Sequence, residues 1–403
     1  MTSPLVAIVG IGADGWTGLA SSARDEIRAA EVLIGSRRQL DLVPAAVAAE
    51  RMAWPSPLVP ALPGLLAEHG SRRMCVLASG DPMFFGVGTV LAGLLGPDRI
   101  RVVPHPSSTS LACARLGWPV QDVEVVSVVG RPVELLHAAI QPGRRLLVLS
   151  AGGATPAAIA ALLAVRGYGS STLTVLERLG APDERTVTGT ASTWDGTVDP
   201  LNVVAVECVA GVDAAVLPPT PGLPDDAYDH DGQLTKREIR AVTLARLAPV
   251  PGQLLWDVGA GAGSIAIEWM RTHRSCRAIA VEDRPERAAR ITANAASLGV
   301  PGLQVVVGRA PAALADLPAP DAVFVGGGGT ALGMVDRCWD ALAVGGRLVV
   351  NAVTMESELI VADGYGKLGG DLTRIAVQRA SPVGGFTGWR PMMPVTQWVV
   401  LKR

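Results

Sequence analysis

Three glycines at alternate positions, where an apolar run gives way to a helical pattern, constrain the fold of this chain most strongly. Residues 253–258 are mostly apolar and predict a buried strand, and apolar side chains at helical spacing follow. The turn between them consists of Gly259, Ala260, Gly261, Ala262 and Gly263. A strand that turns through glycines into a helix brings bare backbone and helix N–H groups close to a ligand. The segment therefore predicts a ligand-binding βα turn.

Two residues after this turn discriminate between cofactors. A dinucleotide fingerprint has a glycine at its sixth position, where this chain has Ser264. A second apolar run, residues 278–281, ends in Glu282, and a carboxylate placed there can accept both hydroxyls of a ribose. The alternate-glycine spacing resembles the first motif of Rossmann-like methyltransferases, which bind S-adenosylmethionine. The alternative is an ordinary βαβ unit whose loop acid is solvated.

The chain divides near its middle. Short apolar runs alternate with longer helical patterns throughout, which predicts an α/β architecture. Residues 213–232 contain four prolines followed by an acidic run, so we interpret them as a linker or lid between domains at 1–212 and 233–403. Beyond it, Thr235 and Glu238 form a capping-box pattern, which favours a structural role at a helix start.

The N-terminal half contains further strands that end in small or polar residues. The first leads into Gly10-Ile11-Gly12-Ala13-Asp14-Gly15, but the acid of a nicotinamide site is missing, because Glu31 precedes the next apolar run. Later strands end in Ser79-Gly80-Asp81-Pro82 and in Pro104-His105-Pro106-Ser107-Ser108. Three more strands, at 145–149, 172–176 and 201–206, predict two α/β lobes with a cleft between them.

Composition narrows the classes of partner. The 403 residues carry a formal net charge of −2 and only three lysines, which argues against nucleic acid. The five cysteines are far apart, without a Cys-x-x-Cys pair, so we expect no metal site and a reducing compartment. Residues 1–4 lack the basic start of a signal peptide, and no apolar stretch reaches the roughly eighteen residues of a membrane helix. We expect a cytoplasmic protein without membrane contact.

The order of the N-terminal motifs resembles the tetrapyrrole methyltransferases, a two-lobed α/β family that binds S-adenosylmethionine between its lobes. Glu177-Arg178-Leu179-Gly180 is the last motif of that series. The C-terminal half resembles the decarboxylating precorrin methyltransferases, with a Rossmann-like fold. The joined pair is similar to fused enzymes of cobalamin synthesis, and the resemblance covers nearly the whole chain.

The resemblance implies specific cofactor contacts, and two S-adenosylmethionine sites per chain. In the N-terminal half they fall on Gly12, Ser79, Gly80, Asp81, Met83, Ser107 and Ser108. In the C-terminal half they fall on Thr235, Gly259, Ala260, Gly261, Ala262, Gly263, Glu282 and Ala310. Related sequences commonly have Pro-Gly after the first Gly-x-Gly, where this chain has Ala13-Asp14, and Arg309 stands where an acid often precedes the alanine.

The implied reaction is methylation of a precorrin-6B-like tetrapyrrole at C-5 by the N-terminal half. The C-terminal half would methylate C-15 and decarboxylate the C-12 acetate, giving precorrin-8. Methyl transfer mainly needs alignment and exclusion of water, so an obvious catalytic triad is not expected. The five histidines are scattered, and none is assigned a catalytic role. Family resemblance also implies a homo-oligomer.

Substrate-side candidates follow the fourth and fifth strands of the C-terminal half, because open α/β sheets bind ligands beyond the carboxyl ends of their strands. They are Gly327, Gly328, Asn351, Thr354 and Glu356. The glycines could instead form a flexible turn, and Asn351 or Glu356 could only cap or solvate a loop. An RNA methyltransferase and a catalytic half joined to a cofactor-sensing half remain the rival functions. A nicotinamide oxidoreductase fits the residues least.

Overall fold

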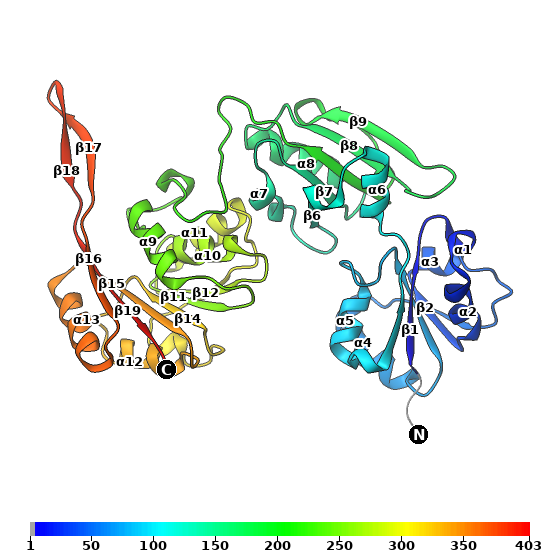
Figure 1. Ribbon diagram of the computed structural model, residues 1–403, viewed down its shortest axis with the longest axis horizontal. Coiled ribbons are helices and arrows are strands. Elements are labelled where there is room, and N and C mark those ends of the chain that lie inside the picture. Colours follow the sequence, from blue (N-terminus) through cyan, green and yellow to red (C-terminus); the bar gives the residue numbers. More distant parts are fainter. Residues whose placement is uncertain (1–4) are drawn as a thin grey trace. The chain divides into compact units, whose positions relative to one another are not determined.

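A computed structural model describes residues 5–403 of the chain (Figure 1). The chain divides into two compact units. The first comprises the chain up to Val133 together with Pro142–Ala215, and the second comprises Glu134–Gln141 together with Val216–Arg403. The expectation of a missing signal peptide falls partly on residues 1–4, which lie outside the described residues.

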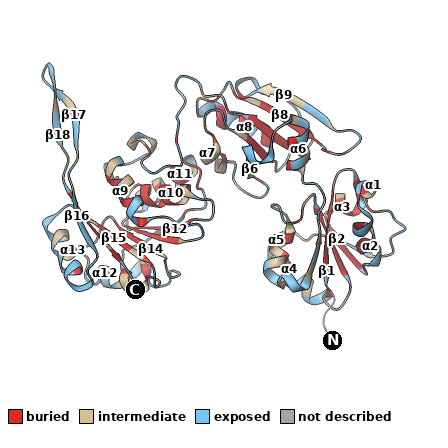
Figure 2. Ribbon diagram, viewed as in Figure 1, coloured by how far each residue is buried: buried red, intermediate tan, exposed pale blue. Residues whose placement is uncertain are grey.

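The first lobe of the first unit is a parallel sheet of five strands in the order β3-β2-β4-β1-β5. Its strands are β1 (Val6–Ile11), β2 (Val32–Gly35), β3 (Glu50–Ala53), β4 (Met74–Ser79) and β5 (Ile100–Val103). Its helices are α1 (Gly15–Gly18), α2 (Ser21–Ala29), α3 (Arg37–Asp41), α4 (Leu58–His69) and α5 (Val87–Leu95), with the 3₁₀ turn Pro97–Arg99. The central strands β1 and β4 are apolar and buried on both faces, except for Ser79 at the end of β4 (Figure 2), as expected of a parallel sheet covered by helices.

The second lobe is a mixed sheet in the order β6-β7-β10-β8-β9, in which only β6 and β7 run parallel. Its strands are β6 (Val123–Ser127), β7 (Arg145–Leu149), β8 (Thr172–Glu177), β9 (Arg185–Thr190) and β10 (Asn202–Glu207). Its helices are α6 (Ser108–Leu116) and α8 (Thr155–Val165), with 3₁₀ turns at Val120–Asp122 and Ala191–Thr193. The 3₁₀ turn Val133–Leu135 leads into α7 (Leu136–Ala139), which packs with the second unit.

The second unit is built on a seven-stranded sheet in the order β13-β12-β11-β14-β15-β19-β16. The first five strands are parallel, and β19 pairs antiparallel with both β15 and β16. The strands are β11 (Leu254–Val258), β12 (Arg277–Glu282), β13 (Gln304–Val307), β14 (Ala322–Val325), β15 (Arg347–Ala352), β16 (Asp371–Ile375) and β19 (Val395–Leu401). The strand order reverses between β11 and β14, which creates a crevice at their carboxyl ends.

Helices cover both faces of this sheet. They are α9 (Arg237–Leu247), α10 (Ser264–Thr272), α11 (Pro285–Ser297), α12 (Met334–Ala341) and α13 (Met355–Leu368), with 3₁₀ turns at Asp225–Ala227 and Ala312–Leu314. The large side chains of Trp256, Trp269 and Trp398 are fully buried in the two clusters that flank the sheet. A hairpin of β17 (Gln378–Val383) and β18 (Phe386–Pro391) extends away from the sheet (Figure 1). The α/β fold class expected from the sequence is confirmed in both units.

Residues 216–232, within the segment predicted as a linker or lid, pack against the second unit as a strap. Glu268 on α10 is buried and accepts hydrogen bonds from the backbone N–H groups of Gly222 and Leu223 at 2.6 and 3.0 Å. The Tyr228 hydroxyl and Arg240 Nε donate to the same carboxylate at 2.8 and 2.5 Å. One buried carboxylate therefore binds the middle of the strap, at Gly222, Leu223 and Tyr228, and joins it to α9.

Candidate active site

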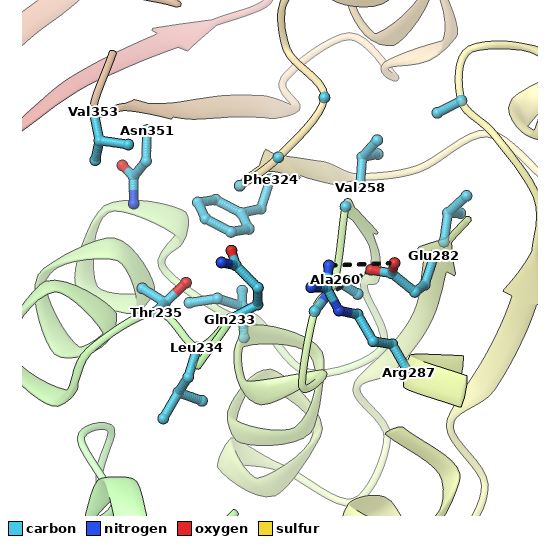
Figure 3. A pocket seen from close by; sticks show the side chains of 18 of the residues that line it. Gln233, Leu234, Thr235, Val258, Ala260, Glu282, Arg287, Phe324, Asn351 and Val353 are labelled. Carbon is cyan, nitrogen blue, oxygen red and sulfur yellow. Dashed lines mark hydrogen bonds and ion pairs between the residues drawn. The ribbon is translucent and has the colours of Figure 1, made fainter. Parts of the chain in front are cut away.

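The second unit has a cavity of about 650 Å³ at the carboxyl ends of its parallel strands. Figure 3 shows Glu282 and Arg287 at one end of it and Asn351 and Val353 at the other, with Gln233 and Phe324 between them. The volume lies within the range of small-molecule sites, and the position is the switch point at which open α/β sheets bind ligands.

The glycine turn forms one wall of this cavity. Gly259 and Gly261 have positive φ angles of 70° and 59°, in the left-handed region that side chains avoid. A Cβ on Gly259 would lie 2.7 Å from the carbonyl oxygen of Gly327, and one on Gly261 would lie 2.9 Å from that of Gln233. Glycine is therefore required here both by the backbone conformation and by the close approach of neighbouring loops.

Glu282 ends β12 beside this turn and is 4% exposed. Its Oε2 accepts a hydrogen bond from the backbone N–H of Gly261 at 2.9 Å, and Oε1 accepts one from Arg284 N at 3.3 Å. Arg287 Nη1 lies 4.0 Å from Oε1 and also faces Asp231, with Nε 2.8 Å from Asp231 Oδ2. The hydrogen bond from Arg287 lowers the pKa of Asp231 to about 2, so this strap carboxylate is ionised at neutral pH.

Asp257, the last polar residue of β11, is buried beneath the turn. Its Oδ2 accepts a hydrogen bond from Ala266 N at 3.0 Å, and its Oδ1 has no hydrogen-bond partner among the described residues. Burial raises the pKa of Asp257 to about 7, and the nearby charge of Glu282 adds to the increase. The floor of the turn thus carries a carboxyl group that gains a proton far more readily than a solvated aspartate.

The capping box predicted at Thr235 and Glu238 is wrong. Helix α9 begins at Arg237, its N-cap is Lys236, and no side chain caps it. Thr235 instead lies in the extended segment before the helix, where it lines the cavity, while Glu238 accepts a hydrogen bond from Arg379 at 2.6 Å. Because the helix starts one residue later than the pattern indicates, Thr235 is not its N-cap and instead lines the cavity.

The substrate-side candidates separate into two groups. Gly327, Gly328 and Asn351 line the cavity, and the Asn351 amide also donates to Thr243 Oγ1 at 3.0 Å. Thr354 and Glu356 do not line it. Thr354 is the N-cap of α13 and accepts a hydrogen bond from Ser357 N, whereas Glu356 is exposed in the first turn of that helix.

The cofactor candidates of the second unit also divide. Thr235, Gly259, Ala260, Gly261, Glu282 and Ala310 line the cavity. Ala262 and Gly263 do not, because Ala262 is buried and Gly263 faces Ile291 on α11. Sequence patterns did not single out Phe324, Lys236 and Arg287, or Met392 and Met393, which all line the cavity. Their positions depend on loops that only the tertiary fold brings together. Arg309, which precedes the cofactor candidate Ala310 in the sequence, also lines the cavity.

The first unit has a cavity of about 500 Å³ lined by both of its lobes. It brings together Gly12, Ser79, Gly80, Asp81, Ser107 and Ser108, which come from three separate strand ends. Met83 lies outside the lining and is 43% exposed. Arg38, Trp54 and Phe84 were not expected from the sequence, although they too line the cavity.

Hydrogen bonds orient the polar side chains of this cavity. The Ser79 hydroxyl accepts hydrogen bonds from Arg38 Nη2 and Gln39 Nε2, both at 3.0 Å. Asp81 Oδ1 accepts one from Met83 N at 2.9 Å, and Ser107 caps α6 by accepting one from Ser110 N at 3.1 Å. The lining is otherwise largely apolar, which suits a large flat ligand with few polar anchors.

The residues of both cavities fit a nucleoside-bearing methyl donor. In the second unit, backbone at two left-handed glycines meets a buried carboxylate able to accept ribose hydroxyls. In the first, the turns at Gly80 and Ser107 converge on one wall, since a Cβ on Gly80 would lie 3.0 Å from the Cα of Ser107. Among residues 5–403, no group of three or more histidine, cysteine, aspartate or glutamate side chains could hold a metal ion, and no helix is long and apolar enough to cross a membrane.

The second unit is a Rossmann-like methyltransferase domain, as defined by its strand order, its glycine turn and a carboxylate placed to accept ribose hydroxyls. It is joined to a two-lobed α/β domain. A family model described as tetrapyrrole (corrin/porphyrin) methylases matches residues 5–195, and one described as precorrin methyltransferase domain matches residues 226–402.

Relatives match along the whole length. A precorrin-6Y C(5,15)-methyltransferase (decarboxylating) from Sinorhizobium is 50% identical, covering 99% of this chain and 96% of that protein. One from Mycobacterium tuberculosis is 48% identical, covering 99% of this chain and 100% of that protein. The crystal structure of the C-terminal domain of a Rhodobacter capsulatus precorrin-6Y C5,15-methyltransferase is 46% identical, covers 46% of this chain and 99% of that chain, and has a TM-score of 0.44. The chain belongs to the decarboxylating precorrin-6Y C(5,15)-methyltransferase family.

Proposed function

We propose that this chain is a bifunctional enzyme that methylates a precorrin twice and decarboxylates it once, using S-adenosylmethionine at two sites. In this proposal residues 233–403 methylate C-15 and remove the carboxyl group of the C-12 acetate. Residues 1–212 methylate C-5, so a precorrin-6B-like substrate becomes precorrin-8. The observation that carries the proposal is the pair of separate cavities, one in each unit, in a chain matched end to end by relatives of that name.

The chain's own residues would position the donor. Bound S-adenosylmethionine supplies an electrophilic methyl group on a sulfonium. Glu282 would accept its ribose hydroxyls, and the backbone at Gly259 and Gly261 allows close approach. In the first unit, Ser79, Asp81 and Ser107 present polar groups to the corresponding cavity. Alignment of donor and nucleophile, together with exclusion of water, is the main contribution required of these residues.

The second cavity also suits a polycarboxylate ring. Phe324, Met392 and Met393 offer apolar surface to the ring, while Lys236 and Arg309 offer positive charge to its carboxylates. Decarboxylation needs an acetate that is desolvated and twisted out of the ring plane, so that its electron pair enters the ring system. We propose that apolar walls with cations near the rim impose this geometry.

A complementation experiment tests the division of labour without assuming the order of the two methylations. Full-length Glu282→Gln and Asp81→Asn variants are incubated with precorrin and S-adenosylmethionine, separately and as an equimolar mixture, at a donor concentration that saturates only an unaltered site. We expect neither variant alone to give the product with two added methyl groups and one lost carboxyl, and the mixture to give it. Mass spectrometry identifies each product. Full product from either variant alone would contradict the assignment.

We also propose that the chain forms a homo-oligomer. The β17–β18 hairpin exposes Phe386 and Trp389, which are 84% and 73% accessible, although aromatic side chains of this size usually bury their surface. Light scattering of the wild type and a Phe386→Ser/Trp389→Ser variant tests this. We expect a multimer for the wild type and a smaller species for the variant, and a monomeric wild type would contradict the proposal.

A further inference from the structure

A histidine–aspartate pair lies in the first unit, at residues that received no catalytic role from the sequence. His105 Nε2 and Asp14 Oδ1 are 3.3 Å apart, and the His105 side chain is only 10% exposed. Asp14 Oδ1 is buried and has no hydrogen-bond partner among residues 5–403, and the His105 ring lies within ion-pair distance of it. Asp14 is one of the two residues that stand where related sequences commonly have Pro-Gly. The pair is therefore built from a departure in this chain's own loop.

The pair lines a smaller cavity of about 310 Å³ between the two lobes of the first unit. The walls come from the α1–α2 segment, the turn after β5, Leu111 on α6 and Gly180 beyond β8. Asp14 and His105 are the only ionisable residues in the described lining. Within that lining, each of the two residues is therefore the only charged partner that the other can have.

The same pair adjoins the larger cavity of the first unit. A Cβ on Gly12 would lie 2.6 Å from His105 Nε2 and 2.5 Å from Asp14 Oδ1. Any side chain at position 12 would therefore clash with the pair. Gly12 lines the larger cavity, and both Pro106 and Leu111 line both cavities. The His105 ring is therefore next to the site at which we propose that C-5 is methylated.

Methylation of a bridge carbon releases a proton. The carbon's electron pair forms the new C–CH₃ bond as the S–CH₃ bond breaks, which leaves a cation on the conjugated system. The C–H bond must then break so that its electron pair restores conjugation, and the proton needs an acceptor. We propose that His105 accepts this proton, with Asp14 as the positioning residue that orients the ring and stabilises the imidazolium. This inference rests on the function proposed above for the first unit.

The chemistry of the two groups supports this assignment. Histidine is the side chain best suited to exchange protons near neutral pH, and a carboxylate oxygen within ion-pair distance of the ring stabilises its protonated form. Asp81, the other acid nearby, already accepts a hydrogen bond from Met83 N. In the second unit, methylation releases a proton but decarboxylation consumes one, and the described lining of its cavity contains no histidine. Only the first unit therefore needs a net proton acceptor, and His105 lies in that unit.

Solvent exchange isolates the proton step from methyl transfer. Full-length protein is mixed with precorrin and S-adenosylhomocysteine in D₂O, and incorporation of deuterium at C-5 is followed by NMR and mass spectrometry. We expect the wild type to exchange this hydrogen and His105→Gln to exchange it about 100-fold more slowly, within the usual range for loss of a general base. His273→Gln, an exposed histidine in the second unit, is the matched control and is expected to exchange like the wild type.

A second arm separates a chemical role from a structural one. Imidazole added to His105→Ala should restore exchange, since the adjoining cavity has room for it, and Asp14→Asn should slow exchange in the wild type but add nothing to His105→Gln. Calorimetry with S-adenosylhomocysteine checks that each variant is folded. Wild-type protein that methylates C-5 while His105→Gln exchanges at the wild-type rate, or absence of imidazole rescue, overturns the inference alone. Wild-type protein that never methylates C-5 defeats the proposed function instead.

Discussion

Both carboxylate oxygens of Glu282 accept hydrogen bonds from backbone N–H groups of the protein. The side chain also lines the cavity, where it could contact the ribose of a bound donor. Oε2 accepts from Gly261 N and Oε1 from Arg284 N, which leaves lone pairs on each oxygen for ligand hydroxyls. Glu282→Gln keeps one acceptor oxygen but removes the charge that strengthens such hydrogen bonds. We expect the affinity of the second unit for S-adenosylhomocysteine to fall about 10- to 100-fold, by calorimetry. Glu286→Gln, an exposed acid on α11, is the control, and equal affinity in both variants would refute a ribose contact.

Asp257 gives the second unit a pH dependence of its own. Its native pKa of about 7 lies above the ordinary value of 3.8, so the native state binds this proton more tightly than the unfolded chain does. The stabilisation is present below about pH 4 and is lost as the pH rises through about 7, by at most about 1.4 kcal/mol per pH unit. Asp257→Asn cannot ionise and should lose less stability than the wild type between pH 5 and pH 8.

Urea unfolding at each pH, followed by the fluorescence of the buried Trp256, Trp269 and Trp398, measures this difference in the second unit. The exposed Asp316→Asn variant should follow the wild-type curve. Parallel curves for Asp257→Asn and the wild type would show that Asp257 does not hold a raised pKa.

Single residues also show where sequence reasoning succeeds. Glu282 could be placed in the site because a strand and an acid at its end are local features. His105 could not, because its partner Asp14 is distant in sequence and the cavity around them forms only when two lobes meet. Thr354 and Glu356 follow a strand, which predicts a place on the substrate side, but a helix begins directly after Thr354 and uses it as its N-cap.

At the scale of elements, the strap of residues 216–232 depends on one buried ion pair. Arg240 is fully buried and Glu268 nearly so, and the Glu268 carboxylate also receives two backbone N–H groups of the strap. Glu268→Gln leaves the Arg240 guanidinium without its closest counter-charge. Removal of one partner from a buried pair commonly costs about 3–5 kcal/mol, and we expect the free energy of unfolding of the second unit to fall by that amount.

Urea unfolding of the full chain measures the loss, with Glu286→Gln as the surface control. A change below about 1 kcal/mol would place Glu268 among ordinary surface acids, contrary to its burial. The strap continues into Gln233 and Thr235, which line the cavity, so the same variant should also weaken S-adenosylhomocysteine binding.

The elements themselves differ in how well the sequence indicates them. The strands that were predicted, such as β7 and β11, are apolar runs buried on both sides. Strand β9 reads Arg-Thr-Val-Thr-Gly-Thr at a sheet edge, and the β17–β18 hairpin is exposed and contains prolines, so neither carries an apolar signal. Pairing partners, which distant residues supply, decide such strands.

At the scale of the whole molecule, two unlike α/β units each provide a cavity of nucleoside-binding size. The first combines turns from three strand ends with an acid–base pair, and the second combines a glycine turn with a buried carboxylate. Because the two sites are built from different residues, a substitution in one cavity should abolish binding there without affecting the other. Binding stoichiometry is therefore the property that distinguishes two catalytic sites from a single site.

Calorimetric titration of the full chain with S-adenosylhomocysteine should give two sites per chain for the wild type. At ligand concentrations that saturate only the unaltered site, Glu282→Gln should give one, because its charge supports only the second cavity. Asp81→Asn should also give one, and the double variant none, while Glu286→Gln keeps two. A wild-type stoichiometry of one, abolished by either substitution alone, would contradict independent sites. It would mean that both units contribute to a single donor site, so that the two methylations would have to share one bound donor in turn.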